Sequence, residues 1–161
     1  MIYPWLVLLH VLFVFGFLLF HGVSMNVFFA LKRVRDISQI RTLLMLSGST
    51  FPIMEGCLLL LIVTGVIDGF AGSWWGKGWI WAGLILLVLI YGAMSGLGTQ
   101  RLNRIRQGVG LPSVYRQPPS ATPLSADELD TLLNRLNPVA LMIIGFGGIA
   151  IITWLMMFKP F

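Results

Sequence analysis

Residues 5–30 read WLVLLHVLFVFGFLLFHGVSMNVFFA, an apolar run that decides the fold class. A helix needs about 20 residues to cross the roughly 30 Å hydrocarbon core of a bilayer, and this run is longer. It nevertheless carries His10 and His21, the two histidines of the chain. The run therefore predicts a membrane-spanning helix with two candidate functional side chains.

The composition of the 161-residue chain is that of a membrane protein. Hydrophobic residues make up 57% of it and charged residues 11%, whereas about 25% of the residues of an average soluble protein are charged. A soluble domain of this size would not bury so much apolar surface. The first apolar run is too long for a cleavable signal peptide and has no basic segment before it, so we expect it to stay in the membrane.

Four apolar runs are long enough to span a bilayer. They cover residues 3–31, 42–70, 78–100 and 138–158. Because backbone polar groups in hydrocarbon must be bonded within their own segment, we expect each run to be a helix. The sequence predicts a single transmembrane domain over residues 1–161, an all-α four-helix bundle with a cytoplasmic loop at 101–137.

The distribution of positive charge predicts the orientation. Nine of the eleven Lys and Arg residues follow the first or the third span, and only Lys77 and Lys159 lie on the other side. Basic loops stay in the cytoplasm, which places both termini outside a bacterial cytoplasmic membrane. These charges form short groups between apolar runs, so the expected partner is the lipid bilayer and not nucleic acid.

The end of the cytoplasmic loop has the pattern of a short helix. Ser125 and Glu128 form a capping box, and a row of leucines follows at helical spacing. The leucines are Leu129, Leu132, Leu133 and Leu136. We expect an interfacial helix on the membrane surface before the last span, with docking onto a partner subunit as the alternative.

Two glycines in the third span have the spacing of a close helix contact. Gly92 and Gly96 match the small-xxx-small pattern, which lets two helices approach. We expect this contact to lie within the bundle. Homodimerisation through the same glycines is the alternative.

The spacing of the two histidines limits what they can bind. Eleven residues return His10 and His21 to within about 20° of one helix face, but separate them by roughly 16 Å along the axis. They therefore cannot ligate the same metal ion or haem iron. Ionisable side chains inside a span are costly and are usually functional, and axial ligation of haem is a common use of such a histidine. A structural imidazole bonded to a neighbouring hydroxyl or carbonyl is the alternative for each.

The second span carries the other unusual polar residues. Pro52 is expected to kink the helix, with Ser49 and Thr50 helping to satisfy the freed backbone. Glu55 follows near the middle of the span, at about the depth of His21, and we predict a hydrogen bond between these two side chains. Such a bond can orient a ligating imidazole, relay protons, or act as a structural polar pair. Asp68, near the outer end, is expected to be solvated.

Several classes of site are missing from the sequence. The single Cys57 excludes an intramolecular disulfide and CxxC metal sites. There is no phosphate loop, nucleophile elbow or pair of carboxylates, so an enzyme is not favoured. Since both histidines lie on one span, a bis-histidine haem would need a ligand from another chain. Otherwise the iron is five-coordinate or has a sixth ligand other than histidine.

The chain resembles small bacterial membrane proteins of four to five helices. The early LLH, the central TGVIDGFAGSWWGKGWIW and the final ITWLMMFKPF carry this resemblance. The group includes CopD copper-resistance proteins, HemJ-type protoporphyrinogen oxidases and predicted integral membrane proteins of unknown function. The HemJ-type resemblance implies haem b at His10. That family also relies on a lysine in a later helix, which the third span lacks, so protoporphyrinogen oxidation is not expected.

These observations predict a haem b-binding membrane protein that acts in electron transfer within a membrane complex. His10 or His21 would ligate the metal, with Glu55 in support. The expected partners are other membrane subunits or further copies of the chain. A cofactor-free accessory subunit is the alternative from a different class, and metal or proton transport is a third.

Overall fold

The computed structural model describes residues 2–161, which fold into helices joined by loops. In chain order the elements are α1 (Tyr3–Leu31), α2 (Ile37–Ala71), α3 (Gly78–Met94), η1 (Ser95–Thr99), α4 (Gln100–Gly108), α5 (Ala126–Asn134), α6 (Pro138–Met142), η2 (Ile143–Gly147) and α7 (Gly148–Phe158). The η elements are π-helical turns that continue their neighbours without a break. The predicted all-α class is therefore confirmed.

Four helical stretches are long and apolar enough to cross a membrane, as the sequence predicted. The first and the last coincide with the predicted spans, residues 3–31 and 138–158. The second begins earlier, at Ile37, because the carboxylate of Asp36 caps it and accepts the N–H of Gln39 at 2.9 Å. The third continues through α4 to Gly108. The four-helix bundle of a multi-pass membrane protein is thus confirmed.

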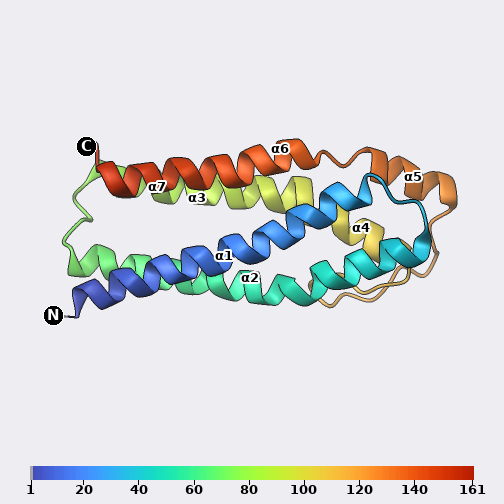
Figure 1. The fold of residues 1–161 in the computed structure, drawn as a ribbon, viewed down its shortest axis with the longest axis horizontal. Helices are drawn as coiled ribbons and strands as arrows, with labels where there is room; N and C mark the ends of the chain where they lie inside the picture. Colours follow the sequence, from blue (N-terminus) through green and yellow to red (C-terminus); the bar gives the residue numbers. More distant parts are fainter. Residues whose placement is uncertain (1) are drawn as a thin grey trace.

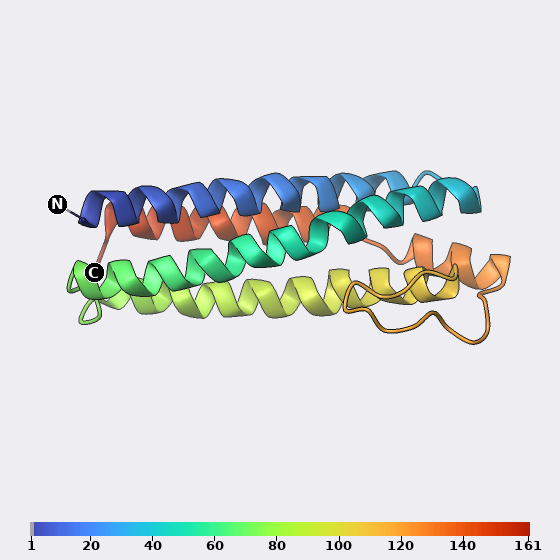
Figure 2. The ribbon, with the colours of Figure 1, turned by 90° about the horizontal axis from the view of Figure 1, so that it is seen from below.

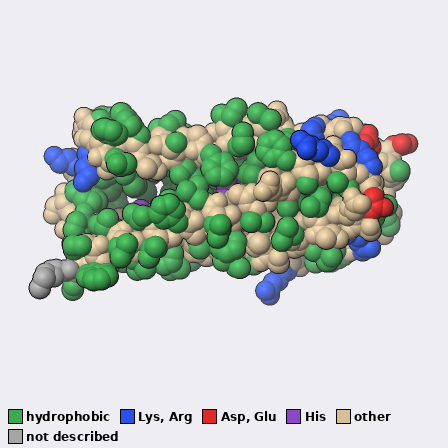
Figure 3. Space-filling view, in the orientation of Figure 1, with side chains coloured by type: hydrophobic (Ala, Val, Ile, Leu, Met, Phe, Trp, Pro, Cys, Tyr) green, Lys and Arg blue, Asp and Glu red, His purple; other side chains and the backbone are tan. Residues whose placement is uncertain are grey.

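The bundle has two unlike ends. Both termini lie at one end, which we call the terminal end, and α5 and the long loop lie at the other, the basic end (Figure 1). The most extensive contacts join α1 to α2 and α3 to α7, so the bundle consists of two helix pairs (Figure 1). Seen from below, α2 approaches α1 toward the basic end (Figure 2). Most Lys and Arg atoms gather at the basic end, and apolar side chains cover the length between (Figure 3).

The main hydrophobic core lies toward the basic end. Its buried members are Met25, Val27, Phe28, Leu31, Ile40, Leu44, Leu102, Ile105, Leu129, Leu133, Leu136 and Leu141. In α1, every buried residue lies from His21 onward. Residues 3–20 therefore form the loosely covered part of this helix.

The helix α5 has the predicted capping box. The Glu128 N–H donates to the Ser125 hydroxyl at 3.3 Å, and the Ser125 N–H donates back to the Glu128 carboxylate at 2.9 Å. Donation from this N–H and from the Ser125 hydroxyl holds the pKa of Glu128 below its ordinary value. Leu129 and Leu133 are buried beside Ile105 of α4. The apolar face of α5 thus covers the end of the bundle and is not left for lipid.

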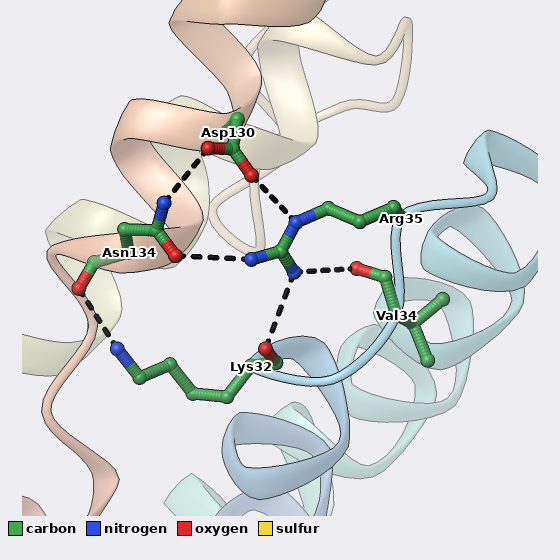
Figure 4. Close-up of polar contacts among 5 residues, drawn as sticks. All are labelled: Lys32, Val34, Arg35, Asp130 and Asn134. Carbon is green, nitrogen blue, oxygen red and sulfur yellow. Dashed lines mark hydrogen bonds and ion pairs between the residues drawn. The ribbon is translucent and has the colours of Figure 1, made fainter.

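Polar contacts attach α5 to the turn between α1 and α2 (Figure 4). The Nε of Arg35 lies 2.5 Å from the Asp130 carboxylate, and its Nη2 donates to the Asn134 side chain at 3.0 Å. Lys32 donates to the backbone carbonyl of Asn134 at 2.8 Å. Both side chains of the ion pair are about half exposed, so it contributes at most about 1 kcal/mol. Its main effect is to fix where α5 sits.

The glycines of the third span do not make the expected contact within the bundle. A methyl group added at Gly92 or Gly96 would meet nothing within 4 Å. The close approach of α3 and α7 occurs instead at Gly148, where an added Cβ would lie 2.3 Å from Ile90. Contact between two copies of the chain through Gly92 and Gly96 stays a prediction.

Arg106 joins three segments at the basic end. Its side chain is buried, its Nε donates to the Pro112 carbonyl of the loop at 2.8 Å, and its Nη1 donates to the Leu44 carbonyl of α2. Gly48 leaves room for it, because a Cβ there would lie 2.7 Å from Nη1. The guanidinium therefore ties α4 to α2 and to the long loop.

Replacing Arg106 by methionine is expected to destabilise the protein by about 1–3 kcal/mol, because the hydrogen bonds of the buried guanidinium to the Pro112 and Leu44 carbonyls are lost. Thermal unfolding in detergent measures this. Arg104→Met is the matched control, since Arg104 lies on the same helix and is exposed, and it should change stability by less than about 0.5 kcal/mol. Equal melting of the two variants would contradict the role of Arg106.

Candidate functional site

His10 is oriented by a threonine of the neighbouring helix. Its Nδ1 lies 3.0 Å from the Thr64 hydroxyl oxygen. The Thr64 hydroxyl also lies 2.8 Å from the Leu60 carbonyl and 3.1 Å from the Leu61 carbonyl. When its proton bonds one of these carbonyls, its oxygen accepts from His10, and we assign the imidazole proton to Nδ1 and the lone pair to Nε2 on this basis.

The surroundings of His10 leave it accessible on one side. A Cβ at Gly65 would lie 3.0 Å from the imidazole Cε1, so only glycine leaves this space on α2. The His10 side chain is half-buried, and none of residues 3–20 of α1 is fully buried. Histidine atoms are visible between the two helix pairs in Figure 3.

Asp68 lies one turn beyond Thr64 on α2 and is not solvated as expected. It is 4% exposed, and its Oδ1 has no hydrogen-bond partner within residues 2–161. The helix ends one turn beyond it, where the Gly72 N–H donates to the backbone carbonyl of Asp68 at 2.8 Å. Near the terminal end, His10 of α1 thus lies beside α2, which carries Thr64 and the buried Asp68 on successive turns.

His21 is enclosed by aromatic rings and by a glycine. It is 5% exposed, stacks on Phe17 with ring centroids 5.4 Å apart, and contacts Phe146 at 5.2 Å. An added Cβ at Gly145 would lie 2.6 Å from its Nε2. This Nε2 is buried and has no hydrogen-bond partner among the described residues.

The predicted hydrogen bond between His21 and Glu55 is wrong. Glu55 lies instead close to Tyr91 of α3, on the wall of one cavity. The depth of Glu55 was predicted correctly, since Glu55 and His21 line the same cavity. The bond fails because His21 turns toward η2, whose Gly145 has no side chain to hold it away.

The cavity between these residues has a volume of about 90 Å³ and receives side chains from all four spans. His21 of α1, Glu55 of α2, Tyr91 of α3 and Gly145 of η2 lie on its wall. Most of the remaining lining is apolar, which is typical of a small-molecule site with few, well-placed polar groups.

Helix irregularities gather around this cavity. Pro52 lies inside α2, and π-helical turns interrupt the third and fourth spans at Ser95–Thr99 and Ile143–Gly147. π-Helical turns inside α-helices are frequent at functional sites. Near Pro52, Ser49 and Thr50 donate to the Leu46 carbonyl at 2.9 and 3.1 Å, and not to the Gly48 carbonyl that the proline frees.

The two histidines belong to different sites, as their spacing predicted. His10 contacts α2 near the terminal end, and His21 contacts η2 at the central cavity. No group of three or more His, Cys, Asp or Glu suited to a metal ion occurs within residues 2–161. A ligand role for either histidine therefore requires a cofactor that brings most of the metal's ligands itself.

Sequence reasoning missed Thr64, Tyr91 and Gly145. Thr64 was detectable in principle, because an antiparallel α1–α2 pair places it at the depth of His10. Tyr91 and Gly145 depend on the rotation of α3 and of the last span, for which hydropathy gives no signal.

Comparison of the chain with protein-family models, with curated proteins and with solved structures found no match. The resemblance to CopD and HemJ-type proteins therefore stays a prediction. The function has to be inferred from the geometry of the two sites.

The contact of His21 with η2 predicts opposite effects for two neighbouring glycines. Gly145→Ala places a methyl group against the enclosed imidazole and should cost about 1–3 kcal/mol. Gly147→Ala meets nothing within 4 Å and should be neutral or stabilise the helix by up to about 1 kcal/mol. Thermal unfolding in detergent compares them. If both variants melt alike, Gly145 does not seat His21.

Proposed function

We propose that this protein binds haem b through His10 and acts in electron transfer within a membrane complex. The observation that carries the proposal is the hydrogen bond from His10 Nδ1 to Thr64. Metal-ligating histidines almost always donate their second ring N–H to a protein acceptor, which fixes the tautomer and the ring orientation. The Nε2 lone pair is then the free ligand atom.

Haem suits this position better than a bare metal ion does. The porphyrin supplies the equatorial nitrogen ligands, so a single imidazole suffices, whereas a bare ion would need a cluster of side chains. Residues 2–161 contain no such cluster. When bound, haem supplies one-electron chemistry, with a potential set by the axial ligands and their hydrogen bonds.

His21 is the weaker of the two candidate ligands. Its Nε2 lies against Gly145 on the wall of a cavity of about 90 Å³, which is too small for a porphyrin. Glu55 lies close to Tyr91 and forms no hydrogen bond with an imidazole, so it gives no support to a ligand at His21. The proposal therefore assigns the iron to His10 alone, with a sixth ligand other than histidine or with none from this chain.

The protein purified from haem-replete cells is expected to show a Soret band. His10→Ala should abolish it, while His21→Ala, the matched control on the same helix, should retain it. Thr64→Val keeps the side-chain shape but removes the acceptor, and should weaken haem retention about 10- to 100-fold. Absorption spectra and the pyridine hemochromogen assay measure haem content.

Two outcomes would contradict the proposal. A colourless preparation without extractable haem would favour the cofactor-free accessory subunit, in which His10 and Thr64 only fix the register of α1 on α2. Loss of the band in His21→Ala with retention in His10→Ala would move the iron to the central cavity.

A further inference from the structure

The wall of the central cavity includes a buried polar atom, the Nε2 of His21, that has no hydrogen-bond partner among the described residues. The side chain of His21 is 5% exposed. An unpaired buried polar group costs about 1–3 kcal/mol. A bound molecule that offers a hydrogen-bonding group to His21 would remove this cost.

The long loop contributes to the wall of the cavity toward the basic end. Tyr115 of the long loop lies on its wall and contacts Phe51 edge to face at 5.6 Å. The loop is held there because the Val114 N–H donates to Asn103 of α4 at 2.9 Å and Arg106 binds the Pro112 carbonyl. An anchored aromatic side chain, itself partly exposed, therefore forms the wall of the cavity at this end.

Beside α3, the wall of the cavity reaches the lipid-facing surface. Tyr91, which lines it, is 45% exposed on the apolar surface, close to the strongly exposed Val88 and Leu89. The third span makes its most extensive contacts with the last span and not with α2. A ligand therefore has access from the hydrocarbon core of the membrane, and must itself dissolve there.

The polar groups on the wall select the chemistry of that ligand. Tyr91 carries a hydroxyl donor, His21 a ring nitrogen, and Glu55 a carboxyl group beside Tyr91. No Lys or Arg lines the cavity, so a fatty-acid carboxylate would lie near Glu55 without a counter-charge. A neutral aromatic ring with carbonyl oxygens matches both the donors and the surrounding phenylalanines.

We propose that the central cavity binds the headgroup of a lipid-soluble quinone, which enters between α2 and α3. The ring lies between the phenylalanines, one carbonyl accepts from Tyr91, and the other pairs with His21. The enclosed volume of about 90 Å³ is below the roughly 150 Å³ of an engineered cavity that holds benzene. The ring therefore displaces side chains, and the lining methionines Met54 and Met94 are flexible enough to move.

This site is separate from the proposed haem site. Its residues do not include His10 or Thr64, and binding of a quinone involves no transfer of electrons. The quinone site can be present in a protein without haem, and the haem can be present without the quinone. A bound quinone would nevertheless supply an electron partner for a haem at His10.

The test is photolabelling of the protein in nanodiscs with an azido derivative of a short-chain ubiquinone, followed by peptide mapping. We expect labelling of cavity residues on α1, η1 or η2, and competition by unlabelled decylubiquinone. Tyr91→Phe removes one hydrogen bond and should weaken binding about two- to tenfold. Tyr3→Phe is the matched control, because Tyr3 lies at the terminal end, outside the cavity.

Gly145→Ala and Gly147→Ala form a second pair. An added methyl group at Gly145 displaces His21 and should abolish labelling, whereas Gly147→Ala should leave it unchanged. The proposal is overturned if the label maps to the tryptophans of the terminal end, or if Tyr91→Phe and Tyr3→Phe bind equally. It is also overturned if oleate competes as well as decylubiquinone, which would indicate an unspecific lipid cavity.

Discussion

In hydrocarbon, each backbone N–H and C=O must find its partner inside the protein, and the whole structure depends on this constraint. It produces four long helices and confines irregular backbone to places that protein covers. Pro52 and the two π-helical turns all lie beside one cavity. Departures from ideal helix geometry cost stability. Because these three lie around the central cavity, they indicate that this depth of the bundle has a function in addition to crossing the membrane.

At the basic end, the side chain of Arg106 supplies hydrogen bonds to backbone carbonyl groups. Arg106 is a buried cation that binds carbonyl oxygens and has no carboxylate partner among the described residues. Removing such a group from water is costly unless its hydrogen bonds are made. Its bonds to α2 and to the loop also hold Tyr115 over the cavity. A contact remote from the polar residues thus shapes one wall of the cavity around them.

The sequence predicted the fold well, because spans are defined by length and hydropathy, which are local properties. It predicted the depth of polar groups too, and therefore that Glu55 and His21 share one level. It did not predict their partners, because a partner depends on how each helix is rotated. Glu55 lies beside Tyr91 and not beside His21 because of the orientation of α3. The position of His21 depends on Gly145 in the last span.

The uneven burial of α1 has a mechanical consequence. Its residues from His21 onward are fixed in the core, while residues 3–20 contain no buried side chain. The other helices keep buried residues at the terminal end, among them Thr64, Trp79 and Leu155, so the loose part of the bundle is the N-terminal half of α1 alone. Local opening is easiest where few apolar contacts must be broken. The first half of α1 is therefore the part of the bundle that is expected to separate first from its neighbours, and it carries His10 with it.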